Sequence, residues 1–131
     1  MTRRHARELA LQTLFSIEIG RHDPHAALDE ALARPGVRDE RGFVRDLVLG
    51  TLDHASESDQ IVAPLLQDWT LERIPTVDRL ILRMAVYEMQ HAPQTPRVVA
   101  INEAIELAKK FSTEDSGRFV NGVLASVAAA S

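Results

Sequence analysis

The sequence contains no cysteine, so it can form neither a disulfide framework nor a thiolate metal site. It also has no apolar run near the roughly 18 residues that a membrane-spanning helix needs, and no secretory apolar segment follows Met1. None of its six glycines stands in a G-x-G or P-loop arrangement, which argues against a nucleotide-binding loop. These absences predict a cytoplasmic protein that has no membrane contact and no cofactor.

No segment shows the alternation of apolar and polar residues that is typical of a β-strand, whereas helical periodicity is present throughout. We therefore expect an all-α fold of about seven helices, with residues 1–131 forming a single domain. The predicted helices cover about 2–19, a short segment that begins at Asp23-Pro24, 39–54, a segment from Ser56 or Ser58 to near Trp69, a segment that begins near Pro75, and a C-terminal pair. Trp69 is expected in the core or between helical subdomains.

The C-terminal pair of helices is the most clearly patterned part of the chain. Apolar residues between 98 and 111 lie on one half of a helix, and Ser112-x-x-Asp115 then predicts a capping box that starts the last helix. Gly122 lies off the core stripe of that helix, where it costs about 1 kcal/mol relative to Ala. Either a neighbouring backbone packs closely against Gly122, or a partner needs the room.

The net charge is −4, which argues against general polyanion binding, but residues 1–7 carry three arginines and no acid. Arg3, Arg4 and Arg7 share one arc of the predicted first helix with Leu11 and Phe15. Guanidinium groups bind phosphates and an aromatic ring stacks on an unpaired base, so this arc suits single-stranded RNA. The alternative is a solvated basic face beside a wider buried stripe.

Catalytic and metal sites are not expected from the sequence. Glu88-Met89-Gln90-His91 has the Glu-x-x-His spacing of di-iron bundles, but such a site needs two copies of the motif and two further glutamates. His22 and His25 flank a turn without a third ligand nearby. No Ser/His/Asp set can be assembled from spacing, although such triads form in space and spacing does not exclude one. The sequence therefore predicts a protein that is not an enzyme.

Three blocks of the sequence resemble the NusB family of bacterial transcription antitermination factors. They are residues 3–8 with 12–15, residues 77–88, and residues 99–111 with 115–124. The resemblance covers essentially the whole chain and implies two three-helix subdomains that pack as one domain. It also implies binding of the boxA element of nascent RNA, together with the small-subunit ribosomal protein NusE, in an antitermination complex of RNA polymerase on ribosomal RNA operons.

The resemblance also assigns roles to individual residues. The RNA-binding positions of the family match Arg3, Arg4, Arg7, Phe15, Asp115, Arg118 and Phe119. The acidic positions that face the ribosomal protein match Glu72 and Asp78. This chain has His5 where a further arginine is common, and Phe15 where tyrosine is frequent, so the ring keeps its stacking face but lacks the hydroxyl. Phe119 also falls on the core stripe of the last helix.

Two alternatives to the antitermination role are left open. One is a NusB-like domain that serves an RNA-modifying system, as in ribosomal RNA methyltransferases that carry such a domain. The chain shows no glycine-rich cofactor loop, which argues against this alternative. The other is a structural helical protein that associates with itself, and a homodimer is compatible with the antitermination role as well.

Overall fold

The computed structural model describes residues 1–130, so Ser131, the last residue of the expected domain, lies outside the described residues. The helices are α1 (Arg3–Gly20), α2 (Pro24–Leu32), η1 (Arg38–Glu40), α3 (Arg41–Asp53), α4 (Ala55–Val62), η2 (Ala63–Leu65), α5 (Thr76–His91), α6 (Arg97–Phe111) and α7 (Glu114–Ala130), with η denoting short 3₁₀ helices. Residues 1–130 contain no strand. The expected all-α fold is thus confirmed.

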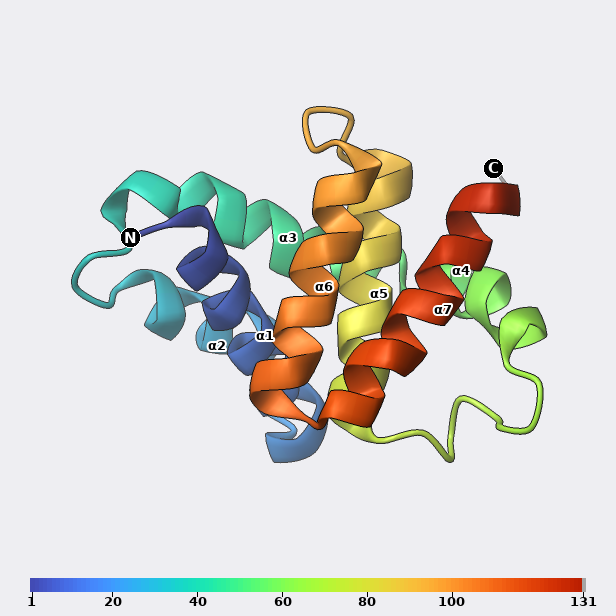
Figure 1. Cartoon of the computed structure of the whole chain (residues 1–131). Helices are drawn as coiled ribbons and strands as arrows, with labels where there is room; N and C mark the ends of the chain where they lie inside the picture. Colours follow the sequence, from blue (N-terminus) through green and yellow to red (C-terminus); the bar gives the residue numbers. More distant parts are fainter. Residues whose placement is uncertain (131) are drawn as a thin grey trace.

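The helices form two groups that share α5 (Figure 1). Helices α1, α2 and α3 pack on one another, while α6 and α7 pack on α5 and on each other. The short α4 lies against α5 and α7, and both α1 and α3 also contact α5. Because α5 contacts both groups, their apolar residues form one continuous core.

Helix α5 is buried along most of its length. Ile81, Met84 and Ala85 lie at 0–3 % exposure, at the spacing that places them on one helical stripe. Glu88 continues the same stripe one turn later and is equally buried. A carboxylate at such a position needs a cationic partner, because an unpaired buried charge is costly. That partner is a residue of α1.

The helix caps agree with the sequence at α2 and differ at α7. The Asp23 carboxylate accepts a hydrogen bond from the Ala26 backbone N–H at 3.0 Å, and Pro24 occupies the first position of α2, as expected. The predicted cap of the last helix at Ser112 is wrong by one residue. The Thr113 hydroxyl accepts the hydrogen bond from the Ser116 backbone N–H at 3.0 Å.

Helix α4 is shorter than expected. It ends at Val62 rather than near Trp69, and η2, which contains Pro64, follows it. Proline lacks a backbone N–H and restricts its predecessor, so the α-helix does not continue. Trp69 therefore lies in the loop before α5 with 58 % of its surface exposed. Of its two expected positions, the core is wrong, and a position between helical subdomains stays a prediction.

The environment of Gly122 excludes one of the two explanations for this residue. A Cβ atom placed there would have no neighbour within 4 Å, so no backbone packs closely against it. The other explanation, that a binding partner occupies the space beside Gly122, stays a prediction. Within residues 1–130, none of the helices combines the length and the apolar character that a membrane span requires.

Candidate nucleic-acid interface

The start of α1 presents arginine side chains beside the first turn of α3. The Thr2 hydroxyl caps α1 by accepting the His5 backbone N–H at 3.1 Å, which fixes where the helix begins. The Arg3 Nε atom donates to Glu40 at 2.8 Å, and the Arg3 guanidinium carbon lies 4.0 Å from the centre of the Phe43 ring. Half of the Arg3 side chain is exposed, so its remaining donors face solvent.

Arg4 lies on the neighbouring side of the helix and pairs with α6. Its Nε and Nη2 atoms donate to the two carboxylate oxygens of Glu103 at 3.0 and 2.8 Å. This hydrogen bonding is the largest cause of the lowered pKa of Glu103 and the raised pKa of Arg4. The Arg4 side chain is 57 % exposed, so the pair lies at the surface.

Arg7 differs from the expected exposed arc of three arginines. Its side chain is 5 % exposed, and its Nε and Nη2 atoms donate to both carboxylate oxygens of Glu88 at 2.9 and 2.8 Å. The cause is the packing of α1 on α5, which places Arg7 opposite the acid in the core stripe. Arg7 borders a groove beside Arg3 and Arg4, but only a small part of its side chain is open to solvent.

A shallow groove runs beside these arginines. Its volume is about 470 Å³, and its lining residues are Thr2, Arg3, Arg4, Arg7, Gln94, Thr95, Pro96, Val99 and Glu103. The groove thus lies between the start of α1 and the turn that joins α5 to α6. The exposed guanidinium groups of Arg3 and Arg4 make it suitable for an anionic chain.

Phe15 lies on the same helix but well away from the arginines. It is eleven residues beyond Arg4, about 16 Å along the helix axis. Its ring is 38 % exposed and borders a hollow of about 270 Å³ with Leu11, Val77 and Phe111. Leu11 is buried and belongs to the core, whereas the Phe15 side chain is partly exposed and available to a partner.

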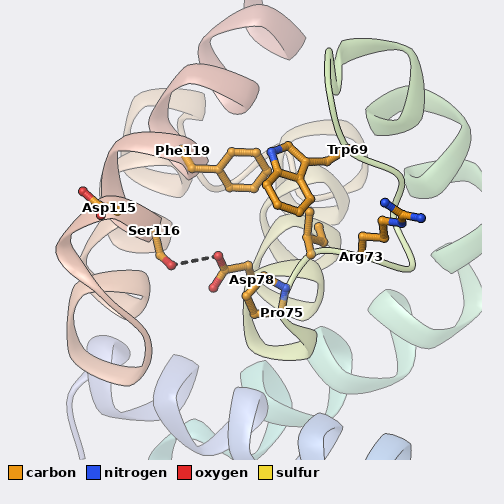
Figure 2. Close-up of a pocket in the computed structure, with 8 residues that line it drawn as sticks. Trp69, Arg73, Pro75, Asp78, Asp115, Ser116 and Phe119 are labelled. Carbon is orange, nitrogen blue, oxygen red and sulfur yellow. Dashed lines mark hydrogen bonds between the residues drawn. The ribbon is translucent and has the colours of Figure 1, made fainter.

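A second candidate surface lies where the loop before α5 meets the start of α7 (Figure 2). It is a pocket of about 400 Å³, and the side chains of Phe119 and Trp69 point toward one another there. Asp115 lies at the rim and forms an exposed ion pair with Arg118. Phe119 is partly buried and packs on the core as well as lining the pocket, so both of its sequence-based roles are compatible with its position.

Asp78 lies at the bottom of this pocket and is only 2 % exposed. Its Oδ2 atom accepts a hydrogen bond from the Ser116 hydroxyl at 2.8 Å, which joins the starts of α5 and α7. Its Oδ1 atom is buried and has no hydrogen-bond partner within residues 1–130. The expectation that Asp78 faces a protein partner directly is thus replaced by a buried position, reachable only through the pocket. Glu72 is exposed in the preceding loop.

The two surfaces lie at opposite ends of α5, because Glu88 and Asp78 are ten residues apart, about 15 Å along the axis. Two lysines that the sequence did not single out for RNA binding lie between these surfaces. The Lys110 ammonium group donates to Glu8 of α1 at 2.9 Å, and the stem of Lys109 lies beside Gly117 of α7. Both lysines are exposed on the last turn of α6. The sequence could have indicated that both lysines are exposed, because they lie on the polar half of the predicted helix.

Comparison with known proteins places this structure in a family. The model of the NusB family matches residues 4–129. The transcription antitermination protein NusB of Geobacillus kaustophilus is 50 % identical over 99 % of this chain and 98 % of its own length. The NusB protein of Symbiobacterium thermophilum is also 50 % identical, over 97 % of this chain and 89 % of its own length.

Solved structures agree with the sequence relatives. A structure of T. maritima NusB has a TM-score of 0.90 at 36 % identity, covering 98 % of this chain and 91 % of that one. A crystal structure of the antitermination factors NusB and NusE in complex with dsRNA has a TM-score of 0.86 at 26 % identity, covering 98 % and 97 % of the two chains. With its all-helical fold and nearly full-length match, the chain belongs to the NusB family.

Proposed function

We propose that this chain is a non-catalytic, cytoplasmic transcription antitermination factor that binds boxA-type RNA together with the ribosomal protein NusE. Support comes from the family, and from the related NusB that was crystallised with NusE and RNA. The observation in this chain that carries the proposal is the pair of exposed guanidinium groups at Arg3 and Arg4, which line one groove.

The ion pairs of Arg3 and Arg4 are compatible with RNA binding. Salt bridges between exposed groups contribute about 0–1 kcal/mol. Both arginines are more than half exposed, and the side chains of Glu40 and Glu103 keep 16 % exposure, so each carboxylate retains contact with water when a phosphate takes its place. Arg3 also keeps donors that do not contact Glu40, because one nitrogen makes the hydrogen bond. Arg7 differs because its ion pair with Glu88 is buried, and separating such a pair leaves an uncompensated charge in the core, which strongly destabilises the protein. We therefore assign phosphate binding to Arg3 and Arg4, and a structural role to Arg7.

The RNA path that we propose follows α6 from the arginine groove to the pocket at α7. Lys110 and Lys109 supply positive charge along the way, and Arg118 continues it at the start of α7. The path ends at the pocket lined by the exposed Trp69 and the partly buried Phe119, where aromatic rings are suited to stacking on unpaired bases. Stacking of this kind is worth about 1–3 kcal/mol per base.

The protein partner needs a separate surface. The hollow beside Phe15 is apolar, lies away from the arginine groove and borders the start of α5 through Val77. Glu72 is exposed in the loop that leads into α5, where it can meet a basic partner. We propose that NusE covers this side, so that RNA and protein occupy adjoining surfaces. The RNA contact that the family resemblance implies for Phe15 stays a prediction, and it would place RNA at the edge of this hollow.

The test is the affinity of a labelled boxA-type single-stranded RNA, measured by fluorescence anisotropy with and without NusE at several salt concentrations. For Arg3→Ala/Arg4→Ala we expect weaker binding. We also expect a salt slope lower by roughly 1.4, or about 0.7 for each phosphate that the protein no longer neutralises. A double-stranded RNA of the same sequence shows which form is preferred.

A matched control removes the same charge elsewhere. Arg21 and Arg34 are exposed and lie outside the arginine groove. Arg21 has a φ angle of 54°, so Arg21→Asn is the suitable change there, combined with Arg34→Ala. This control should keep the wild-type slope. Equal losses of affinity in both double variants, or binding of no boxA-type RNA even with NusE, would contradict the proposal.

Self-association is measured in the same series. Light scattering of the chain alone, with RNA and with NusE distinguishes a homodimer from the expected complexes. If the arginine surface mediates a dimer, added RNA should convert the dimer to a monomeric complex. A dimer that persists unchanged and binds no RNA would favour the structural alternative over the antitermination role.

A further inference from the structure

Three side chains with metal-binding atoms meet where α3 passes into α4 and where α5 ends. The Nδ1 atom of His54 lies 2.9 Å from Oε2 of Glu57, and Nε2 of His91 lies 2.8 Å from the same oxygen. One ligand atom from each residue lies within 4.8 Å of the other two. His91 and Glu57 are 34 positions apart, so the fold rather than local sequence brings them together.

The surrounding helices hold this cluster in place. The imidazole rings of His54 and His91 are stacked with their centres 3.9 Å apart, and the Tyr87 ring stacks on both at 5.6 and 5.8 Å. Gly50 of α3 makes this possible, because a side chain there would collide with the Tyr87 ring. The Tyr87 hydroxyl donates to Asp46 at 3.0 Å, which fixes the ring from the other side.

We propose that His54, Glu57 and His91 form a binding site for a divalent transition-metal ion, with Zn²⁺ as the expected occupant. Two imidazoles and one carboxylate are a ligand set that zinc accepts, with a fourth position left for water. With metal–ligand distances of about 2.0–2.2 Å, tetrahedral ligands lie roughly 3.3 Å apart, so each histidine nitrogen must move about half an ångström away from the Glu57 oxygen that both now contact. The site is new relative to the RNA and protein surfaces, which lie elsewhere on the chain.

Three features favour a metal ion over a purely structural hydrogen-bonded cluster. Each ligand side chain keeps 34–43 % of its surface exposed, so an ion can enter from solvent without unfolding. The carboxylates of Asp46 and Asp53 add negative charge near Tyr87, which attracts a cation. The nitrogen ligands select against Mg²⁺ and Ca²⁺, which prefer oxygen atoms.

Binding would connect the start of α4 to the end of α5 through one ion. A ligand that binds only the folded state stabilises it, and the gain grows with the ratio of free ligand to its dissociation constant. The sequence spacing pairs His91 with Glu88 as the possible metal ligands. The structure instead directs Glu88 to Arg7 and places His91 beside His54 and Glu57.

The experiment uses untagged, chelator-treated protein and titrates Zn²⁺ by isothermal calorimetry, with Co²⁺ absorption as a reporter of coordination. Wild type should bind one equivalent in the micromolar range. His54→Gln and His91→Gln should each weaken binding at least about tenfold, since loss of even an outer-shell partner costs 10–100-fold. Circular dichroism confirms that each variant is folded.

His22→Gln/His25→Gln is the matched control, because these histidines are exposed and outside the cluster. It should bind Zn²⁺ as tightly as the wild type. In the wild type itself, Zn²⁺ should shift the ring NMR signals of His54 and His91 and leave those of His22 and His25 in place. The proposal is overturned if the wild type binds no equivalent of Zn²⁺, if the double variant of His54 and His91 binds equally well, or if the NMR shifts fall on the control histidines.

Discussion

Three arginines near the start of α1, Arg3, Arg4 and Arg7, lie in different environments although they are close in sequence. Arg3 and Arg4 are more than half exposed and pair with glutamates that are 16 % exposed, whereas Arg7, one turn beyond Arg3, is enclosed between α1 and α5 and pairs with a glutamate that is 4 % exposed. All three pairs have similar hydrogen-bond lengths, 2.8–3.0 Å. Bond geometry therefore does not distinguish them, and solvent access does.

The difference determines which pairs can be exchanged for a ligand. In water, the two charges of an exposed pair are solvated whether or not they touch, so separating them costs little. In the core, separation leaves an unpaired charge where the dielectric response is weak. The three arginines that the sequence places in one set thus divide into two exposed side chains, for which we have proposed phosphate binding, and one that joins α1 to α5.

The strongest test of this contrast is Arg7→Ala. It leaves the Glu88 carboxylate buried without its partner, so we expect the free energy of unfolding to fall by about 3–5 kcal/mol in urea denaturation. The double change Arg7→Met/Glu88→Leu removes both charges at similar volume and should recover most of that loss. A single variant within about 1 kcal/mol of wild type, as expected for an exposed pair, would show that the Arg7 pair behaves like the other two.

A second test compares a buried hydrogen bond at the other end of α5 with an exposed one. Ser116→Ala removes the hydroxyl that donates to Asp78 and leaves both carboxylate oxygens without a described donor. We expect a loss of about 1–3 kcal/mol, the usual cost of an unsatisfied buried polar group. Ser126→Ala is the control, because that exposed hydroxyl donates only to the Gly122 carbonyl within its own helix. Equal effects in both variants would remove the distinction between buried and exposed contacts.

The smallest expected effect concerns pH and the Arg4–Glu103 pair. The folded-state pKa of Glu103 is lowered, so its contribution to stability is present above the unfolded pKa and is lost as pH falls through the folded pKa. Thermal melts of Glu103→Gln should therefore approach those of wild type in acid, below the folded pKa, and show a slightly less stable protein at neutral pH. The difference should shrink in high salt. If the variant is instead more stable than wild type at neutral pH, the Arg4–Glu103 pair destabilises the folded protein and the prediction is contradicted.

The periodic features of the fold could be predicted from the sequence because they are local. The 3.6-residue spacing of apolar residues indicates the helices, and Asp23-Pro24 indicates where α2 begins. The position of the last cap is wrong by one residue because Ser112 and Thr113 both offer a hydroxyl, and the backbone geometry decides between them. The same apolar spacing also predicts a helix that continues to near Trp69, through a segment that Pro64 interrupts.

The burial of Arg7 could have been predicted from another part of the chain. Glu88 continues the apolar stripe of Ile81 and Ala85 on α5, and an acid at such a position requires a buried cation. That requirement narrows the candidates to basic residues on helices that pack against α5. In contrast, nothing in the spacing of His54, Glu57 and His91 indicates their proximity, because it depends on how α4 meets the end of α5.

The exposed position of Trp69 has an optical consequence. The chain contains one tryptophan, so its indole fluorescence reports only on the loop between η2 and α5, where Trp69 lies. An indole that is 58 % exposed emits from a water-rich environment, and covering the pocket it shares with Phe119 should move the emission to shorter wavelengths. The protein thus carries its own unlabelled reporter for occupation of that pocket.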